Sequence, residues 1–319
     1  MEKQIDRKRK EAIGKTYMEK TIGYAGTALL NRVYPHSTRH TPEMIADLSR
    51  RAYEYREQVL RMIYERKSGH LGGAFSAAEI LTALYFHQLR LDPENPAWKD
   101  RDRLVFSKGH ACAMLYTVLA HRGYFPVEEL STFRALNSRL QGHPEPRKTP
   151  GVEVPAGPLG HGVAIGAGMA LGARLEGSRR RVYVILGDGE LNAGVIWEDV
   201  MLAAKFGLDN LKVIVDYNGV QQTGTTAKVM PTEPIGAKWT AFNWHVTEIH
   251  GHNMAEVLDA LDLADEVHGM PSVIIAHTTK GKGVDFMENS PQWHGGIPND
   301  EQFQIALGQL RKGAAQWQI

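Results

Sequence analysis

The sequence VYVILGDGELNAG covers residues 182–194, and LKVIVDYN follows at residues 211–218. Each segment begins with a short run of apolar, mostly β-branched residues, which is typical of a buried strand. The runs lead into Asp188 and Asn218, respectively, and a helical pattern over 195–206 separates them. A strand, a helix and a second strand in this order predict a parallel βαβ unit.

The same alternation extends to both sides of this unit. Further strands are predicted over 246–249 and 272–277, and further helices over 41–69, 76–89, 110–121, 160–175, 253–268 and 300–311. Thr41 and Pro42 suit the cap and first position of a helix, and Ser76 with Glu79 has the pattern of a capping box. We therefore expect an α/β fold, a parallel sheet flanked by helices on both faces.

The pattern divides the chain into three parts. Residues 1–44 form an N-terminal arm, 45–298 form the α/β domain, and 299–319 form a C-terminal helix. The first fifteen residues are rich in Lys and Arg, which suits either a solvated arm or a docking arm for another subunit. Acidic residues interrupt the basic run, so nucleic-acid binding is disfavoured.

The composition excludes several classes of protein. Of 319 residues, 43% are hydrophobic and 23% charged, which excludes a disordered chain. Lys and Arg number 37 against 36 Asp and Glu, so the net charge does not indicate a polyanionic partner. The single cysteine, Cys112, cannot form an intrachain disulfide, and we expect a cytoplasmic protein. The sequence has no apolar run long enough to span a membrane.

Asp188 and Asn218 would meet at one edge of the sheet if their strands are neighbours. The carboxyl edge is where α/β sheets bind ligands. Carboxylate and amide oxygens suit Mg²⁺ or Ca²⁺, and the glycines beside Asp188 allow backbone amides to approach a phosphate. Two ordinary turns would show a similar pattern. A nicotinamide site is disfavoured, because the glycines at 166, 168 and 172 fall within a predicted helix.

Four histidines lie beside glycine or proline: His70, His110, His143 and His294. Any one of them alone would more often be structural or simply exposed. Four in turn contexts favour a cleft lined by imidazoles, which can donate to phosphate, accept from hydroxyls and transfer protons. Their spacing does not favour zinc, since they lie far apart and no cysteine pair accompanies them.

At this point the sequence resembles a known family. SGHLGG (68–73), FSKGHACAMLY (106–116), GHPE (142–145), GPLGHG (157–162), GDGEL with WE (187–198), DYNGVQQ (216–222), KGKG (280–283) and WHGG (293–296) occur in the order found in transketolases. The chain is similar over about residues 45–298 to the diphosphate-binding (PP) module of that family. The resemblance implies the thiamine diphosphate-binding fold, with thiamine diphosphate and Mg²⁺ as cofactors; Ca²⁺ or Mn²⁺ can substitute for Mg²⁺.

The resemblance also implies roles for individual residues. The metal ligands would be Asp188, Asn218 and the backbone carbonyl of Val220. The cofactor contacts would be His110, Gly157, Pro158, Leu159, Gly189, Asn218, Gln222, Lys280 and His294. The residues facing the substrate would be His70, His294 and His143.

The sequence departs from the family pattern at two positions. His161 stands where the family usually has Gln. Ala193 stands where the family has an acid that contributes to a network between the two active sites of the dimer. Alanine cannot carry a proton, so this coupling is in doubt unless Glu190 or Asn192 substitutes for the acid.

Activity in this family also requires a pyrimidine-binding (Pyr) module. That module supplies a glutamate that activates the cofactor, and only about 20 residues follow WHGG here. We therefore expect the first subunit of a split transketolase, acting on sugars or sugar phosphates with a partner chain that carries the Pyr module, in an assembly such as α2β2. The alternatives are the corresponding part of 1-deoxyxylulose-5-phosphate synthase or of a 2-oxoacid dehydrogenase α subunit, or a catalytically silent scaffold.

Overall fold

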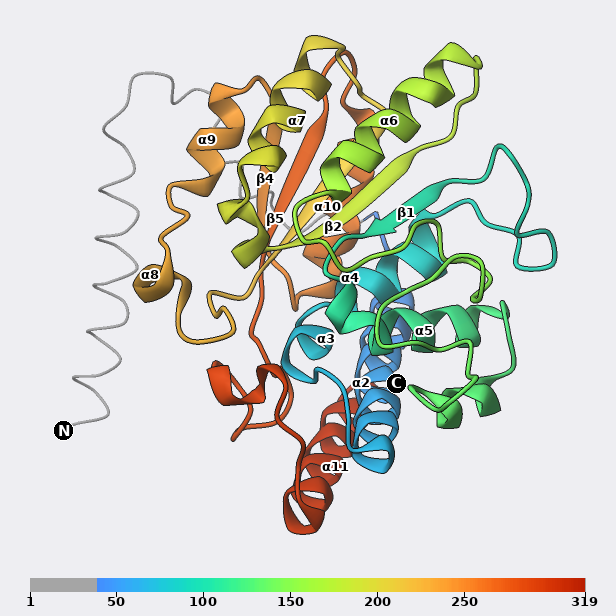
Figure 1. The fold of residues 1–319 in the computed structure, drawn as a ribbon, viewed down its shortest axis with the longest axis vertical. Helices are drawn as coiled ribbons and strands as arrows, with labels where there is room; N and C mark the ends of the chain where they lie inside the picture. The colour runs from blue at the N-terminus through green and yellow to red at the C-terminus, as the bar shows by residue number, and fades with distance from the viewer. Residues whose placement is uncertain (1–38, 319) are drawn as a thin grey trace. The chain divides into compact units, whose positions relative to one another are not determined.

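The computed structural model describes residues 39–318 (Figure 1). Most of the predicted arm, residues 1–44, lies outside the described residues. The predicted α/β class is confirmed, since five parallel strands form one sheet in the order β1-β2-β3-β5-β4. The strands are β1 (Arg103–Phe106), β2 (Val182–Gly187), β3 (Leu211–Tyr217), β4 (His245–His250) and β5 (Ser272–His277).

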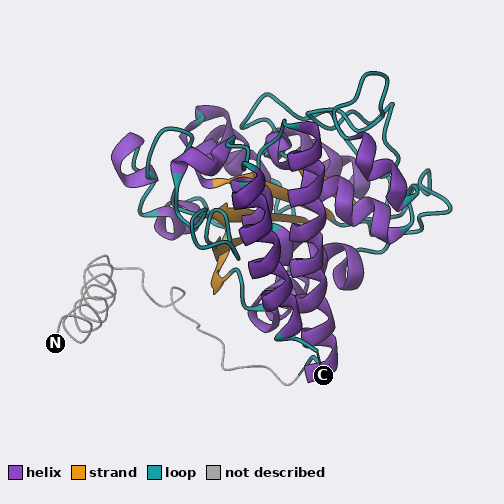
Figure 2. Cartoon of the chain, turned by 90° about the horizontal axis from the view of Figure 1, so that it is seen from below, coloured by secondary structure: helices purple, strands orange, loops and turns teal. Residues whose placement is uncertain are grey.

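Helices cover both faces of the sheet (Figures 1 and 2). One face packs against α6 (Gly162–Leu175), α7 (Gly194–Lys205) and α9 (Ile235–Ala241). On the other side lie α2 (Pro42–Arg66), α3 (Gly72–Ser76), α4 (Ala78–Ala83), α5 (Cys112–Arg122), α10 (Met254–Glu266) and α11 (Asp300–Ala315), of which α11 packs against α2. The short helix α8 (Thr226–Val229) follows the loop after β3, and a π-helix, η2 (Leu84–Gln88), continues α4.

The side chains of β2 show why nearly every residue of a central strand is apolar. Tyr183 and Ile185 belong to the core on the α2 side, whereas Val182, Val184 and Leu186 belong to the core on the α6 side. All five are buried, because successive residues of a strand point to opposite faces and helices cover both faces.

Strand β1 is the one strand among the described residues that the sequence did not predict, and the short helices α3, α8 and α9 were not predicted either. The strand has only four residues, and Arg101, Asp102 and Arg103 precede or begin its apolar run. Such a run is too short to distinguish a strand from a buried turn by periodicity. In the structure it pairs with β2 from Arg103 to Phe106 and forms one edge of the sheet.

Helix α2 begins as predicted. The Thr41 side chain accepts a hydrogen bond from the Met44 amide at 3.3 Å, and Pro42 occupies the first turn. The helix ends one turn before the predicted limit, because Lys67 takes a left-handed conformation with φ of 49° and its amide donates to the Tyr64 carbonyl. Residues in this conformation commonly end helices.

The predicted capping box at Ser76 is wrong. Ser76 is the last residue of α3, and its hydroxyl donates at 2.6 Å to a carboxylate oxygen of Asp216, at the end of β3. Glu79 does not turn back to the Ser76 amide but pairs with Arg56 of α2. Both side chains of the predicted capping box, Ser76 and Glu79, therefore bond to residues that are distant in the sequence.

The C-terminal helix packs against α2. The rings of Tyr64 and Phe303 stack with 3.9 Å between their centroids, and Gly313 lies so close to Tyr53 that a Cβ atom would lie 2.3 Å from the ring. Phe303 and Leu310 belong to the same core cluster as α2 and α5. Across residues 39–318, no helix combines the length and apolarity needed to cross a membrane.

A buried ion pair joins α2 to α4. The Arg56 guanidinium donates to both oxygens of Glu79, at 2.8 and 2.5 Å, and to the Phe75 carbonyl at 3.0 Å. The side chains of Arg56 and Glu79 are 0% and 5% exposed. Arg56 and the nearby His252 lower the pKa of Glu79 against the opposing effect of burial, so the carboxylate is charged.

We expect Arg56→Met to destabilise the protein by about 3–5 kcal/mol, because it leaves the Glu79 charge buried without its main partner. Denaturant unfolding followed by circular dichroism measures this. The matched control is Arg50→Ala, which removes partly exposed pairs with Asp47 and Glu54 on the same helix and is expected to cost about 0.3–0.5 kcal/mol for each pair. If both variants lost the same free energy of unfolding, the buried Arg56–Glu79 pair would not have the importance assigned to it here.

Candidate active site

The carboxyl ends of four neighbouring strands bring the predicted site residues to one edge of the sheet. The segment after β1 carries His110, that after β2 carries Asp188, that after β3 carries Asn218 and Val220, and that after β5 carries Lys280. Because β2 and β3 pair in register up to Gly187 and Asp216, the predicted juxtaposition of their ends is confirmed.

Backbone and hydroxyl donors fix the carboxylate of Asp188. One oxygen accepts from the Gly189 amide at 2.9 Å, and the other accepts from the Gly219 amide at 2.7 Å and from the Thr226 hydroxyl at 3.0 Å. Burial, together with the nearby Asp216 carboxylate, raises the pKa of Asp188. Among the described residues, its hydrogen-bond donors are two amides and a hydroxyl, and none of them is charged.

Asn218 lies beside Asp188 along the turn that follows β3. Its amide oxygen accepts from the Val220 amide at 3.2 Å. The Val220 carbonyl accepts from the Lys280 ammonium at 2.8 Å. Asp188, Asn218 and Val220 therefore present oxygen atoms around the turn over residues 218–220.

Lys280 connects this turn to the histidines. Its Nζ donates to the carbonyl of Val220 and also, at 2.9 Å, to Nδ1 of His294. Since an ammonium group can only donate, Nδ1 of His294 accepts, and a neutral ring carries its proton on Nε2. Burial, and then the charge of Lys108, lower the pKa of Lys280 to about 8.

Three imidazoles gather beside Lys280. Ring centroids lie 5.3 Å apart for His70 and His110, 5.2 Å for His70 and His294, and 5.0 Å for His110 and His294. Burial is the main cause that lowers the pKa of His70 to about 4, of His110 to about 2 and of His294 to about 3. Nearby cations act in the same direction, so all three rings are neutral at pH 7.

The remaining predicted residues lie at the rim. His143 is exposed, and a Cβ atom at Gly157 would lie 3.8 Å from its ring. Pro158 and Leu159 are exposed in the same turn, which packs so closely against Gly109 that a Cβ there would lie 2.5 Å from the Ala156 side chain. The turn over 157–159 thus lies next to the segment that carries His110.

Two other predicted cofactor contacts lie in and beside the loop after β3. Gly189 lies against the Gln221 side chain, where a Cβ would be in ordinary contact at 3.4 Å. Gln222 is exposed in the loop after Val220, and the structure gives it no contact with the other site residues described.

Glu190 is buried and fully engaged within this chain. Its carboxylate accepts from the Ser107 hydroxyl at 2.6 Å and from the Gly160 and Gly187 amides at 3.0 and 2.8 Å. Burial raises its pKa. Ala193 presents only a methyl group, close to the backbone of Gly160. Glu190 therefore joins three segments of this chain.

Sequence reasoning missed the buried ion pair beneath the site. The Lys108 ammonium pairs with Asp216, which is also bound by the Ser76 and Thr278 hydroxyls. Lys108 donates in addition to the Gly73 carbonyl at 2.8 Å. The sequence offered one signal for this pair. Asp216 is an acidic residue at the end of an apolar strand, and a carboxylate in such a place is costly to bury without a cation.

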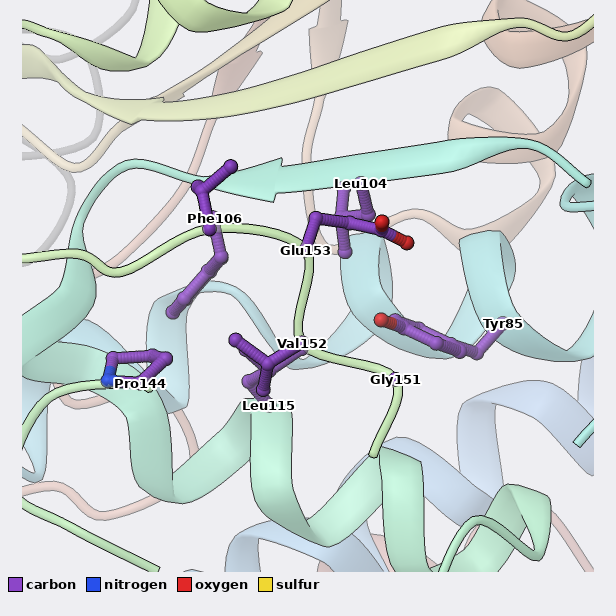
Figure 3. Close-up of a pocket in the computed structure, with 9 residues that line it drawn as sticks. Tyr85, Leu104, Phe106, Leu115, Pro144, Gly151, Val152 and Glu153 are labelled. Carbon is purple, nitrogen blue, oxygen red and sulfur yellow. The ribbon is translucent and has the colours of Figure 1, made fainter. Parts of the chain in front are cut away.

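A small pocket in the structure is separate from this site (Figure 3). It lies between β1, α5 and the segment over 151–154, with Tyr85 and Glu153 on one side. None of the predicted site residues lines it, and Glu153 is paired with Arg101. Leu104, Phe106, Leu115 and Val152 line it and belong to the core, so it fits a gap in core packing.

The donor set fits a hard divalent cation. Asp188 and Asn218 offer a carboxylate and an amide oxygen, and the Val220 carbonyl has a second lone pair beside the one that Lys280 uses. The ammonium of Lys280 suits a phosphate, and the absence of a side chain at Gly189 leaves room for one. Among the described residues, the buried Nδ1 of His70 has no hydrogen-bond partner, which suits a polar ligand that reaches the imidazoles.

Comparison with known proteins finds similar sequences over most of the chain. Residues 49–311 match the family described as transketolase, thiamine diphosphate binding domain. The chain is 41% identical over 273 residues to the 6-deoxy-6-sulfo-D-fructose transketolase subunit of Clostridium sp. (strain MSTE9), covering 86% of this chain and 99% of that protein. It is 40% identical over 255 residues to one of the subunits of the apulose-4-phosphate transketolase of Phocaeicola vulgatus, covering 80% of this chain and 90% of that protein.

Solved structures show the same fold. The transketolase of Campylobacter jejuni superposes with a TM-score of 0.78 at 32% identity, over 85% of this chain and 46% of that one. A transketolase of Pichia stipitis in complex with sedoheptulose-7-phosphate gives a TM-score of 0.76 at 30% identity, over 86% of this chain and 44% of that one. The chain thus matches nearly all of the two subunits but less than half of either solved transketolase.

The neutral imidazoles predict a stability that falls as the pH falls. An unfolded chain takes up protons on histidine near pH 6.5, whereas burial lowers the pKa of His70 to about 4 and that of His110 to about 2. Between about pH 6.5 and pH 4 the unfolded state therefore binds more protons, and each such proton costs up to about 1.4 kcal/mol per pH unit.

Denaturant unfolding between pH 7 and pH 4 tests this with His110→Gln. We expect the variant to lose stability less steeply than the parent over that window. His250→Asn, at an exposed ring, is the control and should follow the parent. A pH slope unchanged by His110→Gln would contradict the neutral state of the buried ring.

Proposed function

We propose that this chain, which belongs to the transketolase family through its thiamine diphosphate-binding domain, is the N-terminal subunit of a two-chain transketolase. It would transfer a two-carbon ketol unit from a ketose or its phosphate to an aldose or its phosphate. The observation that carries the proposal is the gathering of three neutral imidazoles, Lys280 and the oxygen atoms around Asp188 at one sheet edge.

Thiamine diphosphate would supply the carbon nucleophile that adds to the ketose carbonyl and carries the two-carbon unit. Asp188, Asn218 and the Val220 carbonyl would hold Mg²⁺ on its diphosphate. Gly189, Lys280, His110 and the exposed turn over 157–159 would contact the cofactor around that ion, with Gln222 at the edge of the loop. The hard oxygen donors and the absence of a side chain at Gly189 support this assignment.

The imidazoles suit the handling of sugar hydroxyls. Because burial lowers the pKa of His70 and His294 and keeps both rings neutral, each can donate one hydrogen bond and accept another. Lys280 occupies Nδ1 of His294 and thereby leaves the Nε2 proton for donation. His70, His294 and the rim residue His143 would orient the hydroxyl and carbonyl oxygens of the donor sugar and exchange protons with them.

The partner would be a second chain that carries the Pyr module, with two copies of each chain in the assembly. Two relatives that this chain matches over 99% and 90% of their length are themselves named as transketolase subunits, which supports a partner. Those relatives act, by name, on a sulfonated ketose and on apulose-4-phosphate. A sugar or sugar phosphate is the substrate class proposed for this chain, in a cytoplasmic enzyme.

We expect Asp188→Ala to abolish Mg²⁺-dependent retention of thiamine diphosphate, because it removes the only carboxylate of the proposed metal site. Isothermal titration of the cofactor with and without MgCl₂, in the presence of the partner chain, measures this. Asp285→Ala, at an exposed aspartate, is the control and should bind as the parent does.

Unchanged retention in Asp188→Ala would overturn the metal assignment. Failure of the parent protein to bind the cofactor, or binding that ignores the metal, would instead favour the catalytically silent scaffold.

An activity assay tests the dependence on a partner. The purified chain alone is expected to show no ketol transfer, and addition of the Pyr-module chain is expected to produce it. Parallel assays with pyruvate plus glyceraldehyde 3-phosphate, and with a 2-oxoacid, address the two alternative thiamine enzymes. Robust transfer by the isolated chain would contradict the proposal, and activity in either parallel assay would replace it.

A further inference from the structure

A second cluster of potential ligands lies at the amino edge of the sheet, away from the candidate active site. It contains His40, His87 and Asp262, whose ligand atoms all lie within 4.8 Å of one another. His40 directly precedes the cap of α2, His87 lies in the π-helix η2, and Asp262 lies in the last turns of α10. Three elements that are far apart in sequence therefore meet at this point.

The position at the amino edge follows from the neighbours of the cluster. Asp265, which follows Asp262 by about one turn of α10, pairs with Arg181, which directly precedes β2. The same carboxylate lies 3.7 Å from the Lys212 ammonium at the start of β3. The carboxyl ends of β2 and β3, where Asp188 and Asn218 lie, are at the opposite edge.

The distances within the cluster are close to those of a metal site. Nε2 of His40 lies 3.2 Å from one oxygen of Asp262 and 3.7 Å from an oxygen of Asp259, and Nε2 of His87 lies 3.8 Å from the other oxygen of Asp262. Ligand atoms arranged tetrahedrally around Zn²⁺ at 2.0–2.1 Å are separated by about 3.3–3.4 Å. Small side-chain rotations would therefore bring these atoms to one ion.

The His40 ring has a buried nitrogen that could bind a ligand. Its side chain is only 6% exposed, and among the described residues Nε2 has no hydrogen-bond partner although two carboxylates lie within 4 Å of it. The rings of His40 and His87 meet edge to face, at 89° with 4.9 Å between centroids. A buried polar nitrogen without a hydrogen bond is uncommon and calls for a ligand or a proton.

Charge at this point also favours a cation. Asp259, Asp262, Asp265 and Glu266 crowd the C-terminal half of α10, whose last turn has no basic residue. The negative end of the helix dipole adds to their repulsion. Arg181 pairs with Asp265, and Arg39 pairs with Glu266 at 2.8 Å and also lies near enough to Asp259 and Asp262 to interact with their charges. The ion pairs of Asp262 itself among the described residues are with the two imidazoles.

We propose that His40, His87 and Asp262, with Asp259 or a water molecule as the fourth ligand, bind a divalent transition-metal ion such as Zn²⁺. Two imidazoles with a carboxylate suit Zn²⁺ better than Mg²⁺, which prefers oxygen ligands only. The ion fastens the start of α2 to α10 and η2, which is a structural role independent of the ketol transfer.

Zinc binding to the full-length chain, purified without a histidine tag and stripped with a chelator, tests the proposal. Titration with ZnCl₂ in excess MgCl₂, which occupies the oxygen site around Asp188, is expected to show one zinc ion per chain. His87→Asn and His40→Asn should each weaken this binding by about a hundredfold or more, since even the loss of a group that only supports a ligand costs about 10–100-fold. His250→Asn, at an exposed histidine paired with Glu256, is the matched control.

Two further readouts make the test independent of any effect of the substitutions on folding. Replacing zinc by Co²⁺ in the parent protein should give the visible absorption of a tetrahedral site with imidazole ligands. Zinc should also raise the thermal midpoint of the parent by several degrees but leave that of His87→Asn unchanged. Absence of zinc uptake by the parent, or uptake that Asp188→Ala removes and His87→Asn retains, would overturn the proposal.

Discussion

The buried ion pair between Lys108 and Asp216 holds the carboxyl edge of the sheet together. Asp216 is fully buried at the end of β3, and it accepts from Lys108, from Ser76 of α3 and from Thr278 after β5. A carboxylate buried in this way is tolerated only because a cation and two hydroxyls surround it. The requirement to satisfy this one charge therefore fixes three segments that carry site residues: those with His70, with His110 and with Lys280.

Glu190, which follows the neighbouring strand β2, also holds several segments of the chain together. Its three hydrogen bonds connect the segment after β1, the turn that leads into α6 and the end of β2. The two buried carboxylates thus position the segments around the histidines, while Asp188 between them is held mainly by backbone amides. Among the described residues, no lysine or arginine is bonded to Asp188, and its ties to other segments are fewer than those of Asp216. This is the arrangement expected of a group that binds an ion.

The sequence predicted the elements and the ends of the central strands because local patterns encode them. The apolar runs of β2 and β3 are long enough to be recognised, and parallel pairing of neighbours brings Asp188 and Asn218 together without further information. It did not predict β1, because the apolar run of that strand is too short. It also did not predict that the Ser76 hydroxyl bonds to Asp216, 140 positions away, instead of capping a helix. The ion pair of Lys108 and Asp216 and the cluster of His40 with Asp262 were equally hidden, because they depend on tertiary packing between distant segments.

The balance of buried charge explains why metal and diphosphate would have to bind together. Among the described residues of the carboxyl edge, three buried carboxylates (Asp188, Glu190 and Asp216) face two buried ammonium groups (Lys108 and Lys280). The raised pKa values of Asp188 and Glu190 reflect burial first, and for Asp188 also the nearby charge of Asp216. A diphosphate entering alone would add to this excess of negative charge in a region of low dielectric, where repulsion between like charges is strong. In the proposed site, a divalent cation on Asp188 would reverse the sign of the charge near the phosphate oxygens, so we expect the diphosphate to bind only together with the metal.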